Sequence, residues 1–138
     1  MIHSTIASII QQRPLAVIEE SDTLREACQV MCELDVRAVV VTKHKKLVGV
    51  LSERDVIQKC VCPGKHTAEM RVSEAMTKDP STLKDNDSLA SAITMMSEGK
   101  FHHLPILNQG EVVGLLSSDD IPEEYRMLLE RFKEIRGG

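Results

Sequence analysis

Aromatic residues are scarce in this chain of 138 residues, which has no tryptophan, one tyrosine and two phenylalanines. Proteins that bind single-stranded nucleic acid stack the bases on aromatic side chains, and the chain has too few to build such a platform. The formal net charge of -4 also lacks the basic excess that attracts nucleic acid or an anionic membrane surface. We therefore expect neither a nucleic-acid partner nor a membrane partner.

Long apolar runs are missing as well. No run approaches the ~20 residues that a membrane-spanning helix needs, and the first residues do not follow the pattern of a signal peptide. These absences predict a cytoplasmic location. Apolar residues make up 42% of the chain, which is ordinary for a globular domain of about this size. The core must therefore be built from aliphatic side chains and methionine.

Catalytic motifs and zinc motifs are also absent. The sequence contains no Gly-x-Ser-x-Gly, no Walker loop and no paired acids with a reason for a raised pKa, so we expect no enzymatic activity. Its four cysteines are Cys28, Cys32, Cys60 and Cys62. Their spacing, with or without His66, differs from that of zinc-binding cysteine pairs. Reduced thiols without a metal are favoured, and a cysteine-based metal or redox sensor is kept as an alternative function.

What the chain does contain is the same unit twice. A shift of 65 residues without a gap makes ten of the forty positions from 17 to 56 identical. The shift also lays the segment Val48–Asp55 over Val113–Asp120. A repeat of this length is one supersecondary unit used twice. The fold expected is α+β, with two units related by a pseudo-twofold axis and clefts between them.

Apolar periodicity and cap residues predict the order strand, helix, strand, strand, helix in each unit. A short helix precedes each unit, at 4–11 and at 72–77. The first unit is expected to have strands at 15–18, 38–41 and 47–51 and helices at 24–34 and 52–62. The second is expected to have strands at 81–83, 103–107 and 111–116, a helix at 88–97, and a single helical turn at 118–121. A tail helix then starts at Pro122.

One motif ends the third strand of both units. Gly49-x-x-Ser52-x-x-Asp55 and Gly114-x-x-Ser117-x-x-Asp120 place a hydroxyl at a helix N-cap and a carboxylate three residues later. The simpler interpretation is helix capping, in which serine accepts a backbone N–H and aspartate lies near the positive end of the helix dipole. The alternative is a ligand site, in which the carboxylate accepts two hydrogen bonds from a ribose diol.

The two units resemble a pair of cystathionine β-synthase (CBS) domains. The matching segments are GVLSERD and GLLSSDD, the lead-in Met76-Thr77-x-x-Pro80, and the strand entry 101–106. The resemblance implies one CBS-pair module over 1–138, with β-α-β-β-α repeats at 5–62 and 72–121, packed through their sheets, and a helical tail at 122–138. It also implies a regulatory module that binds AMP, ADP, ATP, NAD or S-adenosylmethionine in clefts between the repeats, without a further cofactor.

The resemblance assigns roles to individual residues. Asp55 and Asp120 would hold the ribose hydroxyls, and Ser52 and Ser117 would reach the ribose or the phosphate. Thr77 of the lead-in is included in the site. Basic side chains would face the phosphates, namely Arg37, His102 and His103. Apolar residues of the first strands would enclose the adenine, namely Val17, Ile18 and Leu83. Because successive side chains of a strand alternate, at most one of the two histidines should face a given cleft.

The repeats differ where charge matters. Arg54 of the first unit is replaced by Asp119 in the second, which repels an anionic ligand. We expect the cleft around Ser52, Arg54 and Asp55 to take a phosphorylated ligand in preference to the other. A scaffold or dimerisation element with vestigial clefts is the other alternative, since an apolar tail face predicts docking and the resemblance implies a homodimer. The protein target remains unknown.

Overall fold

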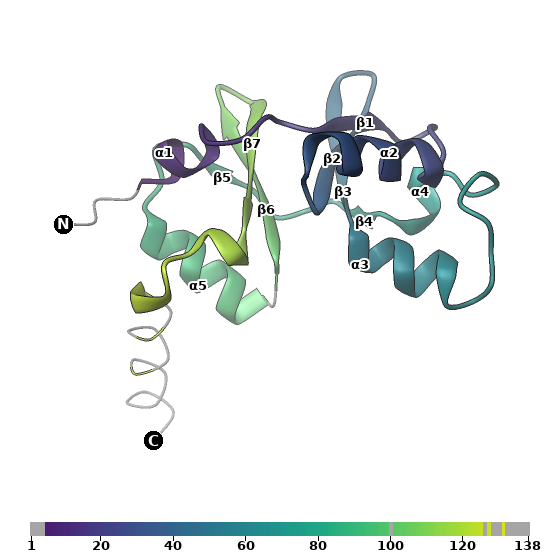
Figure 1. The fold of residues 1–138 in the computed structure, drawn as a ribbon. Helices are drawn as coiled ribbons and strands as arrows, with labels where there is room; N and C mark the ends of the chain where they lie inside the picture. The colour runs from purple at the N-terminus through teal and green to yellow at the C-terminus, as the bar shows by residue number, and fades with distance from the viewer. Residues whose placement is uncertain (1–4, 100, 126, 128–130, 132–138) are drawn as a thin grey trace.

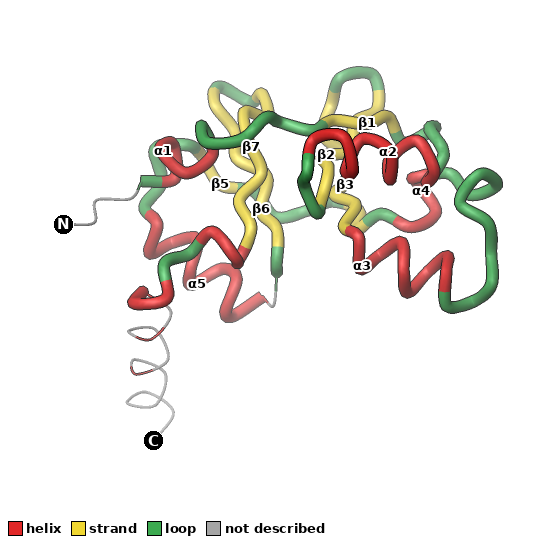
Figure 2. The backbone as a smooth tube through the Cα atoms, viewed as in Figure 1, coloured by secondary structure: helices red, strands yellow, loops and turns green. Residues whose placement is uncertain are grey.

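The computed structural model describes residues 5–99, 101–125, 127 and 131. Two sheets lie side by side in the middle of the molecule, with helices on their outer sides (Figures 1 and 2). The first sheet has the strand order β1-β2-β3-β4 and the second has the order β5-β6-β7. The α+β class and the two-repeat architecture are therefore confirmed. Most of the predicted tail, including its apolar residues after Met127, lies outside the described residues.

The first repeat follows the predicted order. Its elements are β1 (Val17–Glu19), α2 (Leu24–Leu34), β2 (Ala38–Lys43), β3 (Lys46–Ser52) and α3 (Glu53–Val56), which continues as a π-helix over Ile57–Val61. Strand β1 is parallel to β2, and β2 is antiparallel to β3. The hairpin turn consists of His44 and Lys45, both with positive φ, as a two-residue turn between twisted strands requires.

The second repeat has the same order with a shorter end. Its elements are β5 (Leu83–Lys84), α5 (Leu89–Gly99), β6 (His103–Asn108), β7 (Glu111–Ser117) and a 3-10 turn over Ser118–Asp120. This 3-10 turn confirms the predicted single turn. It stays short because Pro122 lacks the N–H that a longer helix would need. The π-helix of the first repeat has no counterpart here among the described residues.

The lead-in helices α1 (Ile6–Ile10) and α4 (Val72–Ala75) are exchanged between the repeats. Ile6 and Ile10 belong to the core of the second repeat, whereas Val72 and Ala75 belong to the core of the first. After α4 the chain adds a short strand, β4 (Thr77–Lys78), to the edge of β3. The corresponding segment between α1 and β1, residues 11–16, forms no strand. This strand was not predicted, since two residues carry no periodicity.

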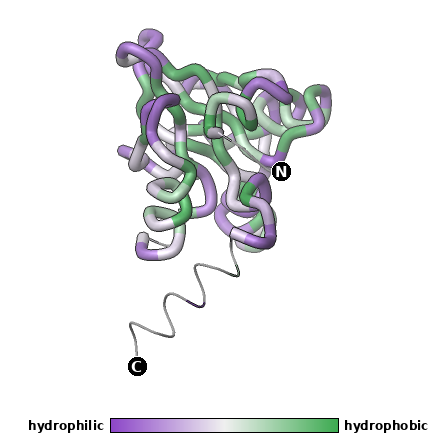
Figure 3. The backbone as a smooth tube through the Cα atoms, turned by 90° about the vertical axis from the view of Figure 1, so that its left-hand side faces the viewer, coloured by the Kyte–Doolittle hydropathy of each residue, from purple (hydrophilic) through white to green (hydrophobic). Residues whose placement is uncertain are grey.

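Strand alternation gives each sheet a second buried face. Val39 and Val41 of β2 are buried in the first core, and Val40 between them is equally buried but belongs to neither core cluster. Pro105 of β6 is likewise fully buried outside both clusters. Since neighbouring side chains point to opposite faces, these residues lie where the two sheets face each other. Hydrophobic residues accordingly run through the centre of the molecule, and hydrophilic residues gather at the loops (Figure 3).

The glycine of each motif allows the exchanged lead-in to lie against the strand. A Cβ atom at Gly49 would lie 2.7 Å from the sulfur of Met76 and 2.8 Å from the backbone oxygen of Thr77. A Cβ atom at Gly114 would lie 2.7 Å from Cβ of Ile10. The glycines therefore fix how closely each linker approaches the serine-aspartate turn. Among the described residues, no helix is long and apolar enough to cross a membrane.

Candidate functional site: two clefts at the serine-aspartate turns

Both serine-aspartate turns are reciprocal helix caps. Ser52 Oγ accepts the N–H of Asp55 at 3.2 Å, and Asp55 Oδ2 accepts the N–H and the hydroxyl of Ser52, each at 3.0 Å. In the second repeat, Ser117 Oγ accepts the N–H of Asp119 at 3.2 Å, and Asp120 Oδ2 accepts the N–H of Ser117 at 2.7 Å. The capping interpretation is therefore confirmed. Capping uses one oxygen of each carboxylate and leaves the role of the other open.

Each turn lies in its own cleft, and we name the clefts after their aspartates. The Asp55 cleft has a volume of about 470 Å³ and the Asp120 cleft one of about 380 Å³. Both volumes lie within the range of small-molecule sites. The exchanged lead-ins supply part of each wall, with Thr77, Pro80 and Ser81 in the Asp55 cleft and residues 13–16 in the Asp120 cleft.

Most of the predicted site residues come together in the Asp55 cleft. Its walls include Arg37, Ser52, Arg54, Asp55, Thr77, His102, His103 and Ser117. The Asp120 cleft includes four of the predicted residues, namely Arg37, His103, Ser117 and Asp120. Four residues, namely Arg37, His103, Ser117 and Asp119, line both clefts, so the two sites adjoin each other.

The three residues predicted to enclose adenine line neither cleft. Ile18 and Leu83 are buried in the cores of the first and second repeat, at 5% and 8% exposure. Val17 is exposed, since the neighbours of an inward-facing strand residue point outward. The apolar parts of the walls come from elsewhere: Ile10, Leu15 and Ala16 in the Asp120 cleft, and Val50, Pro80 and Phe101 in the Asp55 cleft.

The two histidines occupy different kinds of backbone. His103 is the first residue of β6 and lines both clefts, whereas His102 lies in the bend before the strand and lines the Asp55 cleft. The expectation that at most one histidine faces a given cleft is therefore wrong, because strand alternation does not extend to His102. Burial lowers the pKa of His103, and His102 lowers it further, against the opposing effect of nearby Asp55, Asp119 and Asp120.

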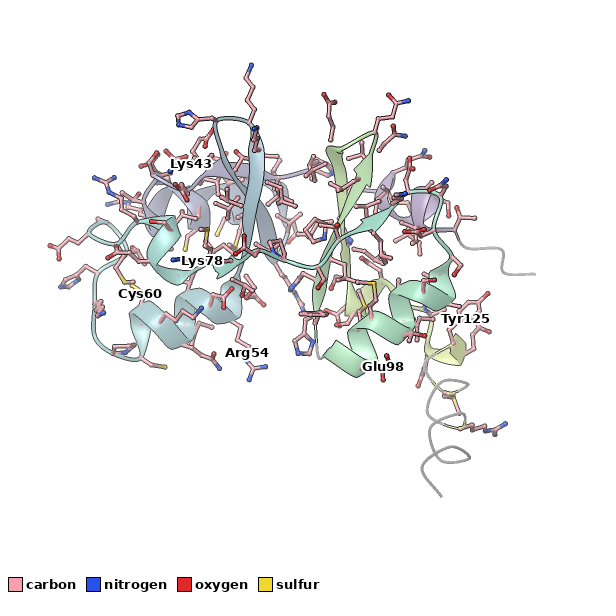
Figure 4. The ribbon with its side chains drawn as sticks, turned by 180° about the vertical axis from the view of Figure 1, so that it is seen from behind. Lys43, Arg54, Cys60, Lys78, Glu98 and Tyr125 are labelled. Carbon is pink, nitrogen blue, oxygen red and sulfur yellow. The ribbon has the colours of Figure 1, made fainter. Side chains whose placement is uncertain are left out.

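Arg37 and Asp119 form part of the boundary between the clefts. Arg37 Nη1 lies 3.7 Å from Asp119 Oδ2, and Arg37 Nε lies 3.9 Å from Glu53 Oε1. Asp119 lines both clefts, so its negative charge is not confined to the second site as the comparison of the repeats suggested. Arg54 lines the Asp55 cleft alone and lies at the N-terminal end of α3, away from Cys60 at the other end of that helical segment (Figure 4).

Arg13 is a site residue that the sequence analysis did not single out. Its Nη1 donates to Asp120 Oδ1 at 2.7 Å, and its Nη2 donates to Asp120 Oδ2 and, at 2.9 Å, to the carbonyl of Leu115. The fork raises the pKa of Arg13, against the lowering effect of its partial burial. A signal was present: Arg13 and Lys78 are basic residues at the same repeat position, each shortly before a proline.

A comparison with known proteins gives the family. The model of the CBS domain matches the chain twice, at residues 6–61 and 72–125. The chain belongs to the CBS domain family. Tandem pairs of this family are regulatory ligand-binding modules, and the match places both serine-aspartate turns of this CBS pair inside a CBS domain.

Relatives of the CBS pair support the assignment. The CBS domain-containing protein CBSCBSPB5 of Arabidopsis thaliana is 36% identical over 100 residues, which is 72% of this chain and 18% of that protein. The chain thus spans about a fifth of the length of such relatives. The solved structure of the CBS domain NE2398 has a TM-score of 0.78 and is 30% identical, with 89% of this chain and 98% of that chain covered. The CBS domain protein PAE2072 from Pyrobaculum aerophilum complexed with AMP also has a TM-score of 0.78 and is 27% identical, with 92% of this chain and 97% of that chain covered.

The cysteines of the CBS pair lie apart from the clefts. Cys60 is buried and donates to the carbonyl of Lys65 at 3.5 Å, and Cys28 is partly buried on α2. Burial raises the pKa of the Cys28 thiol, and nearby Cys32 and Cys60 raise it further, which disfavours the thiolate that binds metals. Within the part of the chain that the structure describes, no group of three or more metal-binding side chains is arranged to hold an ion.

Proposed function

We propose that this CBS pair is a regulatory module that binds an adenosine-containing ligand, such as a nucleotide, in the Asp55 cleft. Binding would change the relation between the two repeats, or between subunits, and a protein partner would respond to that change. The AMP complex of PAE2072, a relative with the same fold over nearly the whole chain, supports this class of ligand. The site, the ligand and the mechanism are all parts of the proposal.

One observation carries the proposal: Asp55 keeps a carboxylate oxygen for a ligand. Its Oδ2 caps the helix, but Oδ1 meets only the ammonium of Lys59 at 3.5 Å among the interactions of the described residues. The closer bond of Lys59, at 2.8 Å, goes to the carbonyl of Ala75. An ionised carboxylate oxygen of this kind accepts hydroxyl donors such as those of a ribose.

The rest of the Asp55 cleft suits the other parts of a nucleotide. Val50, Pro80 and Phe101 give the cleft an apolar section against which a purine can pack. Arg37 and Arg54 bring positive charge to the same cleft, and arginine forms paired hydrogen bonds with phosphate. The cleft thus combines an apolar section, a hydroxyl acceptor and an anion-binding section.

Titration calorimetry with AMP, ADP, ATP, NAD and S-adenosylmethionine tests the proposal. We expect one of these ligands to bind the full chain, and Asp55→Ala to weaken its binding about 100-fold, since two hydrogen bonds to a charged acceptor are lost. Asp120→Ala is the matched variant at the other repeat and should leave the affinity within about threefold. The proposal fails if no ligand binds, or if Asp55→Ala binds as the parent chain does.

The alternative of a scaffold with vestigial clefts has one supporting observation. Ile57 and Val61 lie about one turn apart on the helical segment after Ser52 and are 51% and 57% exposed. Such a pair suits a contact between two copies of the chain. The homodimer therefore stays a prediction. The cysteine-based sensor receives no comparable support from the described residues.

A further inference from the structure

We infer that Arg13 is a built-in occupant of the second ribose-binding position, so that this CBS pair presents one open adenosine site in place of two. The inference rests on the proposed function, because it concerns the same type of site in the other repeat. It makes Arg13 the residue that determines how many ligands the chain binds.

Both oxygens of Asp120 are already in use. Oδ1 accepts Nη1 of Arg13 at 2.7 Å, and Oδ2 accepts Nη2 of Arg13 together with the N–H of Ser117 at 2.7 Å. The same Nη2 donates to the carbonyl of Leu115. A guanidinium held through both nitrogens matches the spacing of a carboxylate. It therefore occupies Oδ1 of Asp120, the oxygen that corresponds to the one left for a ligand at Asp55, and adds a second donor to Oδ2.

Asp55 lies in the same motif but is bound by no guanidinium from the residues that the structure describes. The residue 65 positions after Arg13 is Lys78, which lies in β4 and is exposed. Thr77, its neighbour in β4, lines the Asp55 cleft, and Lys78 does not. Since side chains alternate along a strand, β4 directs Lys78 away from the carboxylate. The segment of Arg13 forms no strand, so its side chain is free of this constraint.

Arg13 also follows a helix that is anchored in the core. Ile6 and Ile10 of α1 are buried in the core of the second repeat. Arg13 lies only three residues after the end of that helix. A ligand that binds at Asp120 must break the two hydrogen bonds from Arg13 to this carboxylate before it gains its own. The Asp120 cleft should therefore bind the same nucleotide much more weakly than the Asp55 cleft.

Stoichiometry measured by calorimetry with AMP on the full chain tests the inference. The parent chain should bind one equivalent, and Arg13→Met, which keeps the apolar stem and removes the fork, should bind two, with affinity at the second site raised about tenfold or more. Lys78→Met is the matched control at the equivalent repeat position and should bind one. Arg13→Met combined with Asp120→Ala should return to one, because the freed carboxylate is then missing.

The outcomes separate this inference from the proposed function. One equivalent in Arg13→Met, lost on Asp55→Ala, would overturn the inference and leave the proposed function in place, as would two equivalents in the parent chain. If AMP does not bind, the same titrations use whichever of ADP, ATP, NAD and S-adenosylmethionine binds the parent chain, and absence of binding of all five ligands in every variant would overturn both. Thermal unfolding checks that Arg13→Met is folded. If it is not, Arg13→Gln, which keeps a donor for the carbonyl of Leu115, takes its place with the same expected stoichiometry.

Discussion

The Asp55 cleft and the Asp120 cleft are built from one motif, yet their carboxylates have different neighbours. Asp55 has one oxygen engaged in the helix cap and a second oxygen 3.5 Å from Lys59. Asp120 has its cap and, in addition, the guanidinium fork of Arg13. The side-chain exposures are similar, at 16% and 13%. The difference between the clefts therefore lies in which atoms are bound and not in access.

The backbone of the lead-ins explains this difference. After α4 the chain forms β4, which pairs with β3 and directs Thr77 to the cleft. Residues 11–16, between α1 and β1, form no strand, and Arg13 turns toward Asp120. An internal repeat thus preserves the motif while a two-residue change of backbone conformation beside it alters what the motif can bind. The predictions below test how far the two halves differ.

The largest effect is expected at Gly49, one of the two glycines that hold the lead-ins against the strands. Gly49→Ala should lower the free energy of unfolding by about 3 kcal/mol, and Gly114→Ala by about 1 kcal/mol. The new Cβ at Gly49 meets the backbone oxygen of Thr77 at 2.8 Å, which is fixed by the pairing of β4 with β3. At Gly114 it meets Cβ of Ile10 at 2.7 Å, on helix α1, which is held by the packing of Ile6 and Ile10 and not by strand pairing, so we expect a smaller loss. Urea denaturation measures both; equal losses would contradict the comparison.

Much of the fold could be predicted from the repeat. The continuous β-rich run at 38–41 and the cap pattern around Thr23 and Glu26 predict β2 and α2, and both form. The exchange of α1 and α4 could not be predicted, because apolar residues such as Ile6 and Val72 indicate burial without saying against which repeat. The π-helix over Ile57–Val61 gives no periodic signal either.

The candidate site was predictable in its polar part only. Ser52, Asp55, Ser117 and Asp120 lie in clefts as the doubled motif indicates. The apolar walls were assigned to the wrong strand positions, because the face to which Ile18 points depends on how the sheets are covered. Arg13 was missed since its partner is 107 positions away, and a contact at that separation depends on tertiary packing.

An intermediate effect is expected from removing each aspartate. Asp55→Ala should lower the free energy of unfolding by about 1 kcal/mol, the typical value of a helix cap. Asp120→Ala should lower it by about 2 kcal/mol, because it also leaves the partly buried guanidinium of Arg13 without its carboxylate. A double-mutant cycle with Arg13→Met isolates the ion pair. A coupling energy of zero in urea denaturation would show that the pair contributes nothing to stability.

The smallest effect is expected at His103, which lines both clefts and is therefore shared by them. Burial, and secondarily His102, holds its pKa below the ordinary value of 6.5. Below pH 6.5 the unfolded chain therefore takes up the proton more readily than the native chain. The contribution of neutral His103 to the free energy of unfolding is fully present above that pH, and it is lost as the pH falls through the lower native pKa.

His103→Gln should flatten this part of the pH profile of the free energy of unfolding, measured from pH 8 to 5.5. His102→Gln, at the exposed neighbour, is the control and should leave most of the slope, since burial of His103 is the larger cause. The carboxylates of Asp55, Asp119 and Asp120 oppose the shift from both clefts, which is why we expect the change to be smaller than at either aspartate. An unchanged slope in His103→Gln would mean that this histidine does not couple protonation to folding.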